Sequence, residues 1–383
     1  MRFIHTADWH LGRLMHGQRL LDDQAYALEQ LVDLVRDFKP SAFLICGDLY
    51  DRAVPSPDAV QLLDEFLAKV VIELKTHVII IAGNHDSPAR LEFGARVFAE
   101  QGLHVFGSPC NGTHKISLDD AAGPVNFYGI PYAEPAVVRE KLGREDLQGH
   151  EPALAAMLDC IRAQHPAGER SVLLAHAYVN GCANAESERP LSIGGAECVE
   201  AKIFAGFDYT ALGHLHRPQT AGNENIRYSG SLLKYSFSEA DHKKIINLIE
   251  MDESGHCETR QVSLTVRRDV RKIEGFLKDI QEGKNIGNRD DYVSVSLLDR
   301  VPILDVMGKL REVLPNVLHV ERPYLETGGG AVRAPEDHRK LGDADLFAAF
   351  YNEVTGEGLS QEQTQAYNRI VDDLRQRERE AVA

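Results

Sequence analysis

Five short segments of the chain follow apolar runs and carry side chains that can bind a cation. They are Asp8-Trp9-His10, Cys46-Gly47-Asp48-Leu49-Tyr50-Asp51-Arg52, Ala82-Gly83-Asn84-His85-Asp86, His176 and Gly213-His214-Leu215-His216. Each segment alone is weak, because an Asp is often a turn former and a lone His is usually a core residue. Functional sites in layered α/β folds gather at the carboxyl ends of strands. Five such segments in succession therefore predict loops that converge on one site.

The candidate ligands sort into two groups that share one carboxylate. Asp8, His10 and His216 form one group, Asn84, His176 and His214 form the other, and Asp48 lies between them. Mixed imidazole and oxygen ligands suit Mn, Fe or Zn rather than Ca. Two such ions about 3.5 to 4 Å apart form a clamp for phosphoesters and activate a water as the nucleophile. His85, beside Asn84, is the candidate acid or electrostatic stabiliser for the leaving oxygen.

The elements that must position these residues alternate between short strands and amphipathic helices. We expect strands at Arg2–Thr6, Ala42–Cys46, Val78–Ala82, Val125–Ile130, Val172–Ala175 and Tyr209–Leu212. Gln24, Leu28, Leu31 and Val35 recur at helical spacing, and Pro40 ends that helix. The pattern predicts an α/β fold in which strands are covered by helices.

The remainder of the chain predicts two smaller parts. The strand-rich stretch from Ile226 to Ser263 closes a first domain at residues 1–265. A small α+β domain follows at 266–326, with a helix carrying Val270, Ile273, Leu277 and Ile280, a strand Tyr292–Leu297, a helix entered at Pro302 and a strand Val317–Val320. A linker at 327–342 leads to a helical tail at 343–383. A first tail helix is predicted by the apolar residues Leu346, Phe347, Phe350, Tyr351 and Val354, and a second by the capping box of Ser360 and Gln363. The tail either meets a partner or folds back on its own domain.

Charge and composition limit the classes of function. The 42 Lys and Arg residues against 58 Asp and Glu give a net charge of -16, so the overall charge disfavours binding to a polyanion. A polyanion would have to bind a local basic surface or be brought by a partner. The six cysteines include no C-x-x-C pair, which favours a reducing compartment. No apolar run reaches the ~20 residues of a membrane span, and the first residues do not form a secretory signal. We expect a cytoplasmic protein without a membrane partner.

The order of the five segments resembles that of the calcineurin-like metallophosphoesterases. More narrowly, the segments 5–12, 82–87 and Tyr235-Ser236-Phe237-Ser238-Glu239 are similar to those of the SbcD nuclease subunits. The resemblance implies two packed mixed β-sheets flanked by helices, a small α+β capping domain and a tail bound to a partner.

The same resemblance implies an activity and its partners. The activity is a Mn²⁺-dependent DNA nuclease that acts in DNA repair, recombination and replication. It would be a 3'-to-5' exonuclease on double-stranded ends and an endonuclease on single strands and hairpins. The partners implied are an SbcC-type coiled-coil ATPase and a second copy of the chain, within a heterotetramer.

Roles for individual residues follow from the same resemblance and from their place beside the motifs. The resemblance implies the ligand grouping given above, a His85 that faces the leaving-group oxygen, and an Asp51 that holds His85. Arg13, Arg52, Arg90 and Arg217 lie beside the motifs in the sequence, which makes them candidates for a basic rim that contacts DNA. Surface arginines without a function are the alternative.

Two rival functions remain open. One is a phosphodiesterase or phosphatase acting on small molecules with the same fold, against which the appended domain and tail argue. The other is a scaffold that has lost catalysis, against which the intact ligand set and His85 argue. A nuclease assay with a small phosphodiester as a second substrate separates the three.

Overall fold

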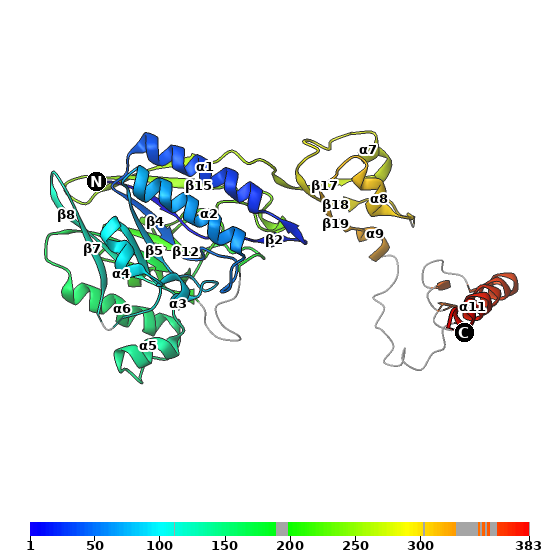
Figure 1. The fold of residues 1–383 in the computed structure, drawn as a ribbon, viewed down its shortest axis with the longest axis horizontal. Coiled ribbons are helices and arrows are strands. Elements are labelled where there is room, and N and C mark those ends of the chain that lie inside the picture. The colour runs from blue at the N-terminus through cyan, green and yellow to red at the C-terminus, as the bar shows by residue number, and fades with distance from the viewer. Residues whose placement is uncertain are drawn as a thin grey trace. The chain divides into compact units, whose positions relative to one another are not determined.

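The computed structural model describes residues 1–110, 112–188, 198–301, 303–326, 344, 347–348, 351–352 and 358–382. The chain forms two compact units (Figure 1). The first comprises Met1–Ile273, Ile286–Ser294 and Leu314–His319, and the second comprises Glu274–Asn285, Val295–Val313 and Val320–Ala383. Among the described residues, no helix combines the length and the apolar character needed to cross a membrane.

The first sheet of the larger unit contains three of the strands that precede candidate ligands. Its order is β16-β15-β1-β4-β5-β6. The strands are β1 (Arg2–Thr6), β4 (Ala42–Cys46), β5 (His77–Ile81), β6 (Leu103–Phe106), β15 (Ile245–Met251) and β16 (Cys257–Ser263). β1, β4 and β5 are parallel neighbours, whereas β15 pairs antiparallel with β1. The loops after β1, β4 and β5 therefore leave the sheet at the same edge.

The second sheet contains the other two ligand-bearing strands. Its order is β13-β14-β12-β9-β8-β7. The strands are β7 (His114–Asp120), β8 (Gly123–Ile130), β9 (Arg170–His176), β12 (Tyr209–Gly213), β13 (Gln219–Ala221) and β14 (Asn223–Tyr228). β9 and β12 are parallel, so their carboxyl ends also share an edge. All six strands predicted from the apolar runs are present, within two residues at each end.

Alternate side chains of the strands pack the two sheets face to face. Phe3 of β1 lies between the sheets, whereas Ile4 packs with the helices on the outer face. In β9, Val172 and Leu174 lie between the sheets and Leu173 faces outward. Both faces of these strands are buried, which is why they read as continuous apolar runs in the sequence. The predicted α/β fold of two packed mixed sheets flanked by helices is confirmed.

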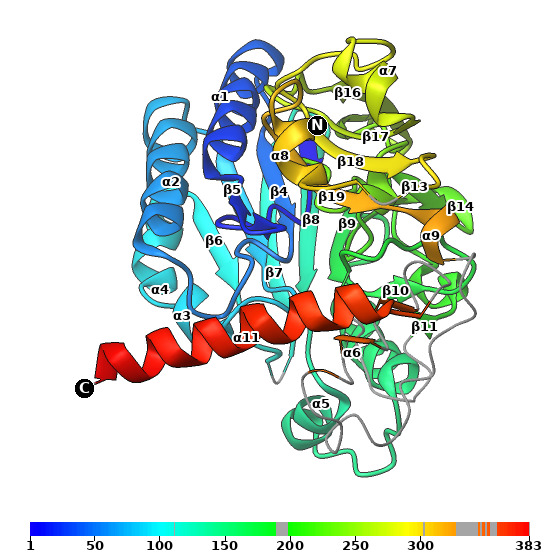
Figure 2. The same ribbon diagram turned by 90° about the vertical axis from the view of Figure 1, so that its right-hand side faces the viewer.

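Helices cover the outer face of each sheet. α1 (Leu21–Phe38) and α2 (Pro57–Leu67) lie side by side against the first sheet (Figures 1 and 2). α1 has the predicted buried face and ends at Phe38, with Lys39 as its C-cap directly before Pro40. α6 (His150–Gln164) packs on the second sheet through Leu154, Leu158 and Ile161. The shorter elements are α3 (Pro88–Leu91), α4 (Ala95–Phe98), α5 (Pro135–Leu142), a π-helical segment at Ala68–Glu73, 3₁₀ turns at Ala99–Gln101, Ala201–Phe204 and Phe237–Glu239, and the strand pairs β2 (Leu14–Met15) with β3 (Gln18–Arg19) and β10 (Tyr178–Val179) with β11 (Cys198–Val199).

A three-stranded sheet of order β17-β18-β19 follows the larger sandwich in the sequence. Its elements are β17 (Val270–Gly275), α7 (Leu277–Gln281), β18 (Tyr292–Leu297), α8 (Val306–Arg311), β19 (Val317–Glu321) and α9 (Pro323–Glu326). The predicted helix through Val270 and Ile273 is wrong, because both residues lie in β17. Their three-residue spacing fits one helical turn, but both are β-branched and buried in a sheet, where such side chains pack well. The helix begins only at Leu277.

The second tail helix, α11 (Gln361–Val382), begins at the predicted capping box. The main-chain N–H of Gln363 donates to Ser360 Oγ over 3.2 Å, and the N–H of Ser360 donates to Gln363 Oε1 over 2.8 Å. Phe347 stacks on Tyr367 with ring centroids 4.4 Å apart. Leu346, Phe350 and Val354 of the predicted first tail helix, the linker 327–342 and Pro302 lie outside the described residues. The proposed domain boundaries stay a prediction.

Candidate metal centre

All seven predicted ligands lie at one edge of the two-sheet sandwich, at or just after the ends of strands. Asp8 and His10 follow β1, Asp48 follows β4, Asn84 follows β5, His176 ends β9, and His214 and His216 follow β12. Contacts join the loops of the two sheets. The Asp8 carboxylate accepts the main-chain N–H of His214 over 2.9 and 3.1 Å, and Asn84 Oδ1 lies 2.9 Å from His176 Nε2.

Two glycines allow the sheets to approach closely at this edge. A Cβ atom at Gly213 would lie 1.7 Å from the main-chain oxygen of Cys46, and one at Gly47 would lie 2.2 Å from His176 Nδ1. Both distances exclude any side chain, so only glycine fits. The segments G-D-x-x-D and G-H-x-H therefore each begin with a residue that the packing requires.

Several of the ligand residues hold a strained backbone. Asp8, His10 and Asp48 have φ angles of 53°, 46° and 49°, and His214 has a φ of 106°. Residues other than glycine adopt such angles at a cost of about 1 to 3 kcal/mol each, and they cluster at functional sites. The backbone strain at these four residues therefore lowers the stability of the fold and sets the direction of their side chains.

Asp48 stands between the two ligand groups. Its Oδ2 atom lies 3.7 Å from His10 Nε2 and 3.5 Å from His176 Nε2. Among the described residues, three sets of His, Asp, Glu or Cys side chains have ligand atoms within 4.8 Å of one another: Asp8, His10 and Asp48; Asp48, His176 and His214; and His10, Asp51 and His85. The first two sets correspond to the two groups expected around a shared aspartate. Their role as ligands stays a prediction.

The donor atoms fit cations because bare lone pairs of His176 and His216 point at neighbouring donor atoms. His176 donates its Nδ1 proton to the Cys46 carbonyl over 2.9 Å, so the Nε2 atom that contacts Asn84 Oδ1 is bare. The Nδ1 atom of His216 lies 2.8 Å from Ser187 Oγ and 3.2 Å from Glu239 Oε1, which favours a proton there. Its Nε2 atom then faces His10 Nε2 at 3.1 Å as an acceptor. A positive ion beside the bare His176 nitrogen and the Asn84 oxygen removes the repulsion between their lone pairs.

Burial keeps these imidazoles neutral, as metal coordination requires. Burial lowers the pKa of His10 and of His214 well below the ordinary value, and neighbouring histidines add to the effect. Burial also lowers the pKa of His176 and of His216, although nearby carboxylates oppose it. The opposite holds for Asp8, because burial and the charge of Asp48 raise its pKa well above the ordinary value. A cation beside Asp8 and Asp48 would offset that repulsion.

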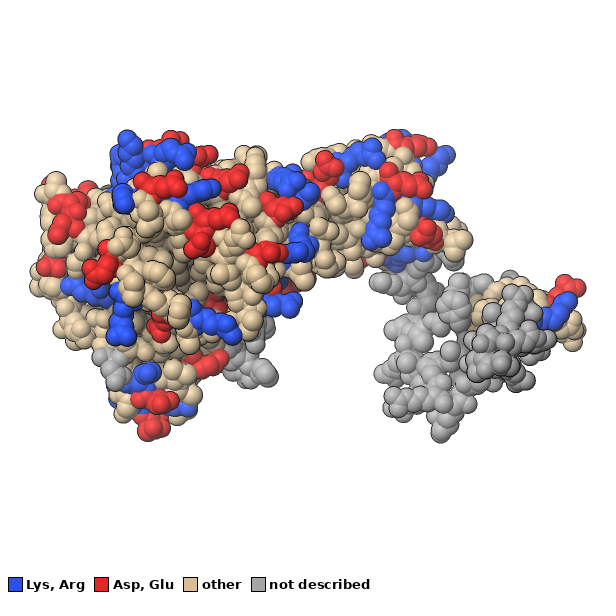
Figure 3. Space-filling model, viewed as in Figure 1, with Lys and Arg blue, Asp and Glu red and all other residues tan. Residues whose placement is uncertain are grey.

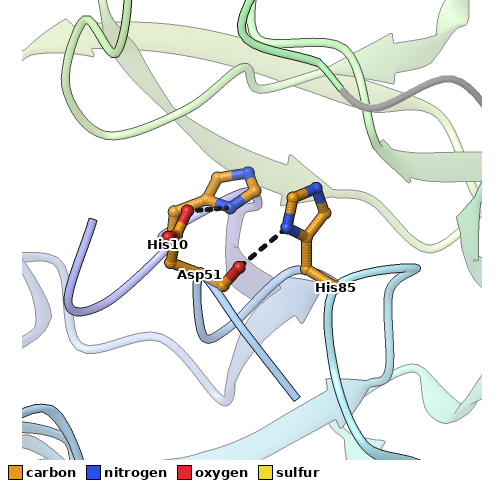
Figure 4. Close-up of side chains that lie close together, drawn as sticks. All are labelled: His10, Asp51 and His85. Atoms are coloured by element: carbon orange, nitrogen blue, oxygen red, sulfur yellow. Dashed lines mark hydrogen bonds and ion pairs between the residues drawn. The ribbon is translucent and has the colours of Figure 1, made fainter. Parts of the chain in front are cut away.

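Asp51 contacts His85 through its main chain rather than its carboxylate (Figure 4). The Nδ1–H of His85 donates to the Asp51 carbonyl oxygen over 2.9 Å, and the main-chain N–H of His85 donates to Asp48 Oδ1 over 2.8 Å. The Asp51 carboxylate lies 3.8 Å from His10 Nδ1 and accepts from Arg13 over 2.7 Å. Asp51 therefore contacts His85 as the sequence predicts, but through a main-chain atom that any residue type would provide.

Asp86 is a structural residue of the site to which the sequence analysis gave no role. Its buried carboxylate accepts the main-chain N–H groups of Leu49, Tyr50 and Gly83 over 3.1, 3.0 and 2.9 Å. It therefore ties the loop after β4 to the loop after β5. Burial and the charge of Asp48 raise its pKa to about 7. Its place in the G-N-H-D segment was the signal that could have identified it.

Glu239 and Lys244 form a buried ion pair behind His216, which the sequence analysis also did not assign. Lys244 Nζ donates to Glu239 Oε2, to the main-chain oxygen of His216 over 2.7 Å and to Ser231 Oγ over 2.8 Å. Burial opposes ionisation of Glu239, but Lys244 and His216 outweigh it and hold its pKa below the ordinary value. The signal for Glu239 was the segment Tyr235–Glu239.

The four candidate DNA-binding arginines differ in their surroundings. Arg52, Arg90 and Arg217 are exposed, and Arg52 Nε lies 3.6 Å from the Asp51 carboxylate. Arg13 is mostly buried and bonds both Asp51 and the Ser187 carbonyl. Basic and acidic side chains are interspersed over the larger unit on the face shown in Figure 3. The arginines as a DNA contact stay a prediction.

Comparison with known families agrees with this geometry. A family model described as "Calcineurin-like phosphoesterase" matches residues 1–218, which is more than half of the chain and includes all seven donors. The protein belongs to the calcineurin-like phosphoesterase family. A second family model, SbcD_C, described as "Type 5 capsule protein repressor C-terminal domain", matches residues 266–355 of the phosphoesterase. The two matches together are consistent with an SbcD nuclease of the metallophosphoesterase superfamily.

Solved structures similar to this phosphoesterase share little sequence with it. The calcineurin-like phosphoesterase YfkN from Bacillus subtilis is 13% identical, with a TM-score of 0.34 over 70% of this chain and 90% of that chain. TT1561 of Thermus thermophilus is 16% identical, with a TM-score of 0.37 over 68% and 98%. A dimetal phosphatase from Danio rerio is 12% identical, with a TM-score of 0.39 over 70% and 98%.

Proposed function

We propose that this phosphoesterase is the Mn²⁺-dependent DNA nuclease subunit of a cytoplasmic SbcC-SbcD type complex. The observation that carries the proposal is the meeting of seven donors from five strands, with bare nitrogen atoms at 2.9 to 3.1 Å from a second donor and His85 beside them. The second family match, at residues 266–355, supports a nuclease over an enzyme for small molecules.

The donors would hold two divalent cations. Asp8, His10 and His216 would bind one cation, Asn84, His176 and His214 the other, and Asp48 would bridge them. When bound, the two cations would activate a water for attack on phosphorus and neutralise charge on the phosphoryl oxygens.

The protein's own groups would orient the reaction. The Asp51 carbonyl fixes the His85 ring through Nδ1–H, so Nε2 is the ring nitrogen that would carry the second proton of an imidazolium and pass it to the leaving oxygen. Figure 4 shows that second nitrogen on the side of the ring away from Asp51. Asp48 also accepts the main-chain N–H of His85, which links the acid to the shared cation ligand.

The partners follow from the same proposal. The substrates would be double-stranded ends, where the chain acts as a 3'-to-5' exonuclease, and single strands or hairpins, where it acts as an endonuclease. An ATPase with a coiled coil would bring the DNA, since a chain of net charge -16 attracts a polyanion poorly. Two copies of the chain would work together in that complex, and its reactions would serve DNA repair, recombination and replication.

One assay tests the proposal. The purified chain is incubated with Mn²⁺, a labelled hairpin duplex and a chromogenic phosphodiester, with and without the ATPase, and with His85→Ala as the control. We expect cleavage of both substrates and a gain on the duplex with the ATPase. Cleavage of the small diester alone would support an enzyme for small molecules, and loss of all activity would support a silent scaffold.

The arginine contacts have a separate test. If Arg90 meets a phosphate, Arg90→Gln lowers the salt dependence of DNA binding, with the slope of log K against log salt smaller by about 1. An unchanged slope contradicts the contact. Lys69→Gln, on the π-helical segment 68–73, serves as the matched exposed control.

A further inference from the structure

In the group of Asp8, His10 and His216, a carboxylate lies near the Nδ1 atom of each imidazole. Glu239 Oε1 lies 3.2 Å from His216 Nδ1, and Asp51 Oδ1 lies 3.8 Å from His10 Nδ1. Each carboxylate is in turn held by a basic side chain. Lys244 pairs with Glu239, and Arg13 pairs with Asp51 over 2.7 Å. Only the Glu239 contact is a hydrogen bond, whereas the Asp51 carboxylate lies beyond hydrogen-bond distance of His10 and adds negative charge near it.

The support behind His216 is rigid. Glu239 is fully buried, and it also accepts a hydrogen bond from Ser187 Oγ and from the main-chain N–H of Tyr235. Lys244 bonds Glu239 and the His216 carbonyl together, so the carboxylate cannot turn away from the ring without breaking several bonds. Glu239 therefore fixes the proton of His216 on Nδ1 and leaves Nε2 free as a ligand.

Tyr235, in the same segment as Glu239, holds the planes of both rings. Its ring meets His10 edge to face, with centroids 5.5 Å apart, and meets His216 at 5.7 Å. Its hydroxyl donates to the Trp9 carbonyl and accepts from Gln24 Nε2 over 3.2 Å, which anchors the ring. The segment Tyr235–Glu239 has no role in the catalytic proposal. It packs against the two histidines of one cation position and holds their orientation.

The group of Asn84, His176 and His214 contains fewer anionic groups than the group of Asp8, His10 and His216. The Nδ1 proton of His176 goes to the neutral carbonyl of Cys46, and Asn84 contributes a neutral amide oxygen. An imidazole backed by a carboxylate is a stronger metal ligand than one backed by a carbonyl, because the anion raises the basicity of the distal nitrogen. Asp8 adds an anionic ligand to the first group, where Asn84 adds none to the second.

We propose that Glu239 is a positioning residue for His216 and that Glu239 and Asp51 make the Asp8, His10 and His216 position the tighter of two cation positions. This inference rests on the proposed function only in taking the seven donors as ligands of two cations. One position would then fill before the other as the Mn²⁺ concentration rises.

The test is a Mn²⁺ titration of the full-length chain, followed by calorimetry and by electron paramagnetic resonance of free Mn²⁺. We expect two binding steps whose dissociation constants differ by about tenfold or more. Glu239→Gln keeps the size of the side chain but removes its charge, and it should weaken the tighter step about 10- to 100-fold. The weaker step should change less than twofold. Glu250→Gln on β15, whose carboxylate pairs with Arg2 at the surface, is the matched control and should leave both steps unchanged.

Ser187→Ala is a second variant that leaves the Glu239 and Lys244 pair in place. It removes one acceptor for the His216 proton, so we expect a smaller weakening of the same tighter step. If Glu239→Gln does not fold, as judged by circular dichroism, Ser187→Ala decides the question. An unchanged titration of Ser187→Ala would then overturn the proposal.

Three other results would overturn it. They are equal affinity at both positions of the unmodified chain, an effect of Glu239→Gln on the weaker step, and a stoichiometry above two, which would make Asp51 a ligand beside His10 and His85 rather than a support. The titration contains no DNA. A chain that binds Mn²⁺ in two unequal steps but leaves DNA intact therefore contradicts the nuclease proposal and not this one.

Discussion

The Nδ1–H of His85 donates to the main-chain carbonyl oxygen of Asp51 over 2.9 Å. A carbonyl can only accept, so this contact fixes both the orientation of the ring and the position of one proton. We expect His85→Ala to lower the rate of Mn²⁺-dependent phosphodiester cleavage about 10²- to 10⁴-fold. Mn²⁺ stoichiometry, measured by calorimetry, should stay at the value of the unmodified chain. Asp51→Asn keeps the carbonyl, so its loss of rate should be smaller than that of His85→Ala.

Removal of metal should destabilise the protein, because cations would bind the folded site and not the unfolded chain. At a concentration 100 times its dissociation constant, one bound ion adds about 2.7 kcal/mol to the free energy of unfolding. We expect the thermal midpoint to rise by several degrees when Mn²⁺ is added to protein stripped with a chelator. Asp48→Asn, which removes the shared anionic ligand, should abolish most of that rise. An equal rise in this variant would show that Asp48 does not bridge the ions.

Substitution of Gly213 should be strongly destabilising. A Cβ atom there would lie 1.7 Å from the Cys46 oxygen, so Gly213→Ala requires the two sheets to separate at the site. We expect a loss of at least about 3 kcal/mol in denaturant unfolding. Gly206→Ala is the control, since that glycine has a φ of 97° and no atom within 4 Å of a Cβ. It should cost only about 1 to 2 kcal/mol from backbone strain.

The free energy of unfolding should fall in acid through Asp120. Hydrogen bonds from Arg170 and from the N-terminal ammonium hold the pKa of Asp120 well below its ordinary value. A depressed folded-state pKa gives stability that is fully present above the unfolded value of about 4 and is lost as pH falls below it. Denaturant unfolding of Asp120→Asn should show a deficit of about 1 kcal/mol at pH 7 that shrinks toward pH 3. A deficit independent of pH would assign the effect to packing instead.

Truncation after Tyr324 should separate the two proposed activities of the chain. The tail helix α11 begins with a hydrogen-bonded capping box, and Ile370 in it is largely exposed. If the tail binds the coiled coil of the ATPase, the truncated chain no longer co-purifies with it. Cleavage of a small phosphodiester should be retained, because the proposed ligands all precede residue 217. Retained co-purification would locate the partner surface elsewhere.

The sequence by itself predicted six strands of the two large sheets and the order of the candidate ligands along the chain. β4 is apolar on both faces, so its run is visible without knowledge of the fold, and the residues after it are fixed by sequence adjacency. The capping box at Ser360 and Gln363 was visible for the same reason, because both partners lie within four residues. The pair Val270 and Ile273 misled the prediction, because a three-residue spacing fits a helical turn, whereas in β17 it places two buried side chains on opposite faces of a strand.

Only the tertiary structure decided which groups support the ligands. Glu239 meets His216 across 23 positions of the chain, and the Asp51 carboxylate turns to His10 and Arg13 while its carbonyl holds His85. Such contacts depend on how two sheets stack and on where Gly47 and Gly213 let them touch. Residue spacing within a segment carries no information about contacts between remote segments. Hydrogen bonds between such segments form only when burial of both sheets brings them together.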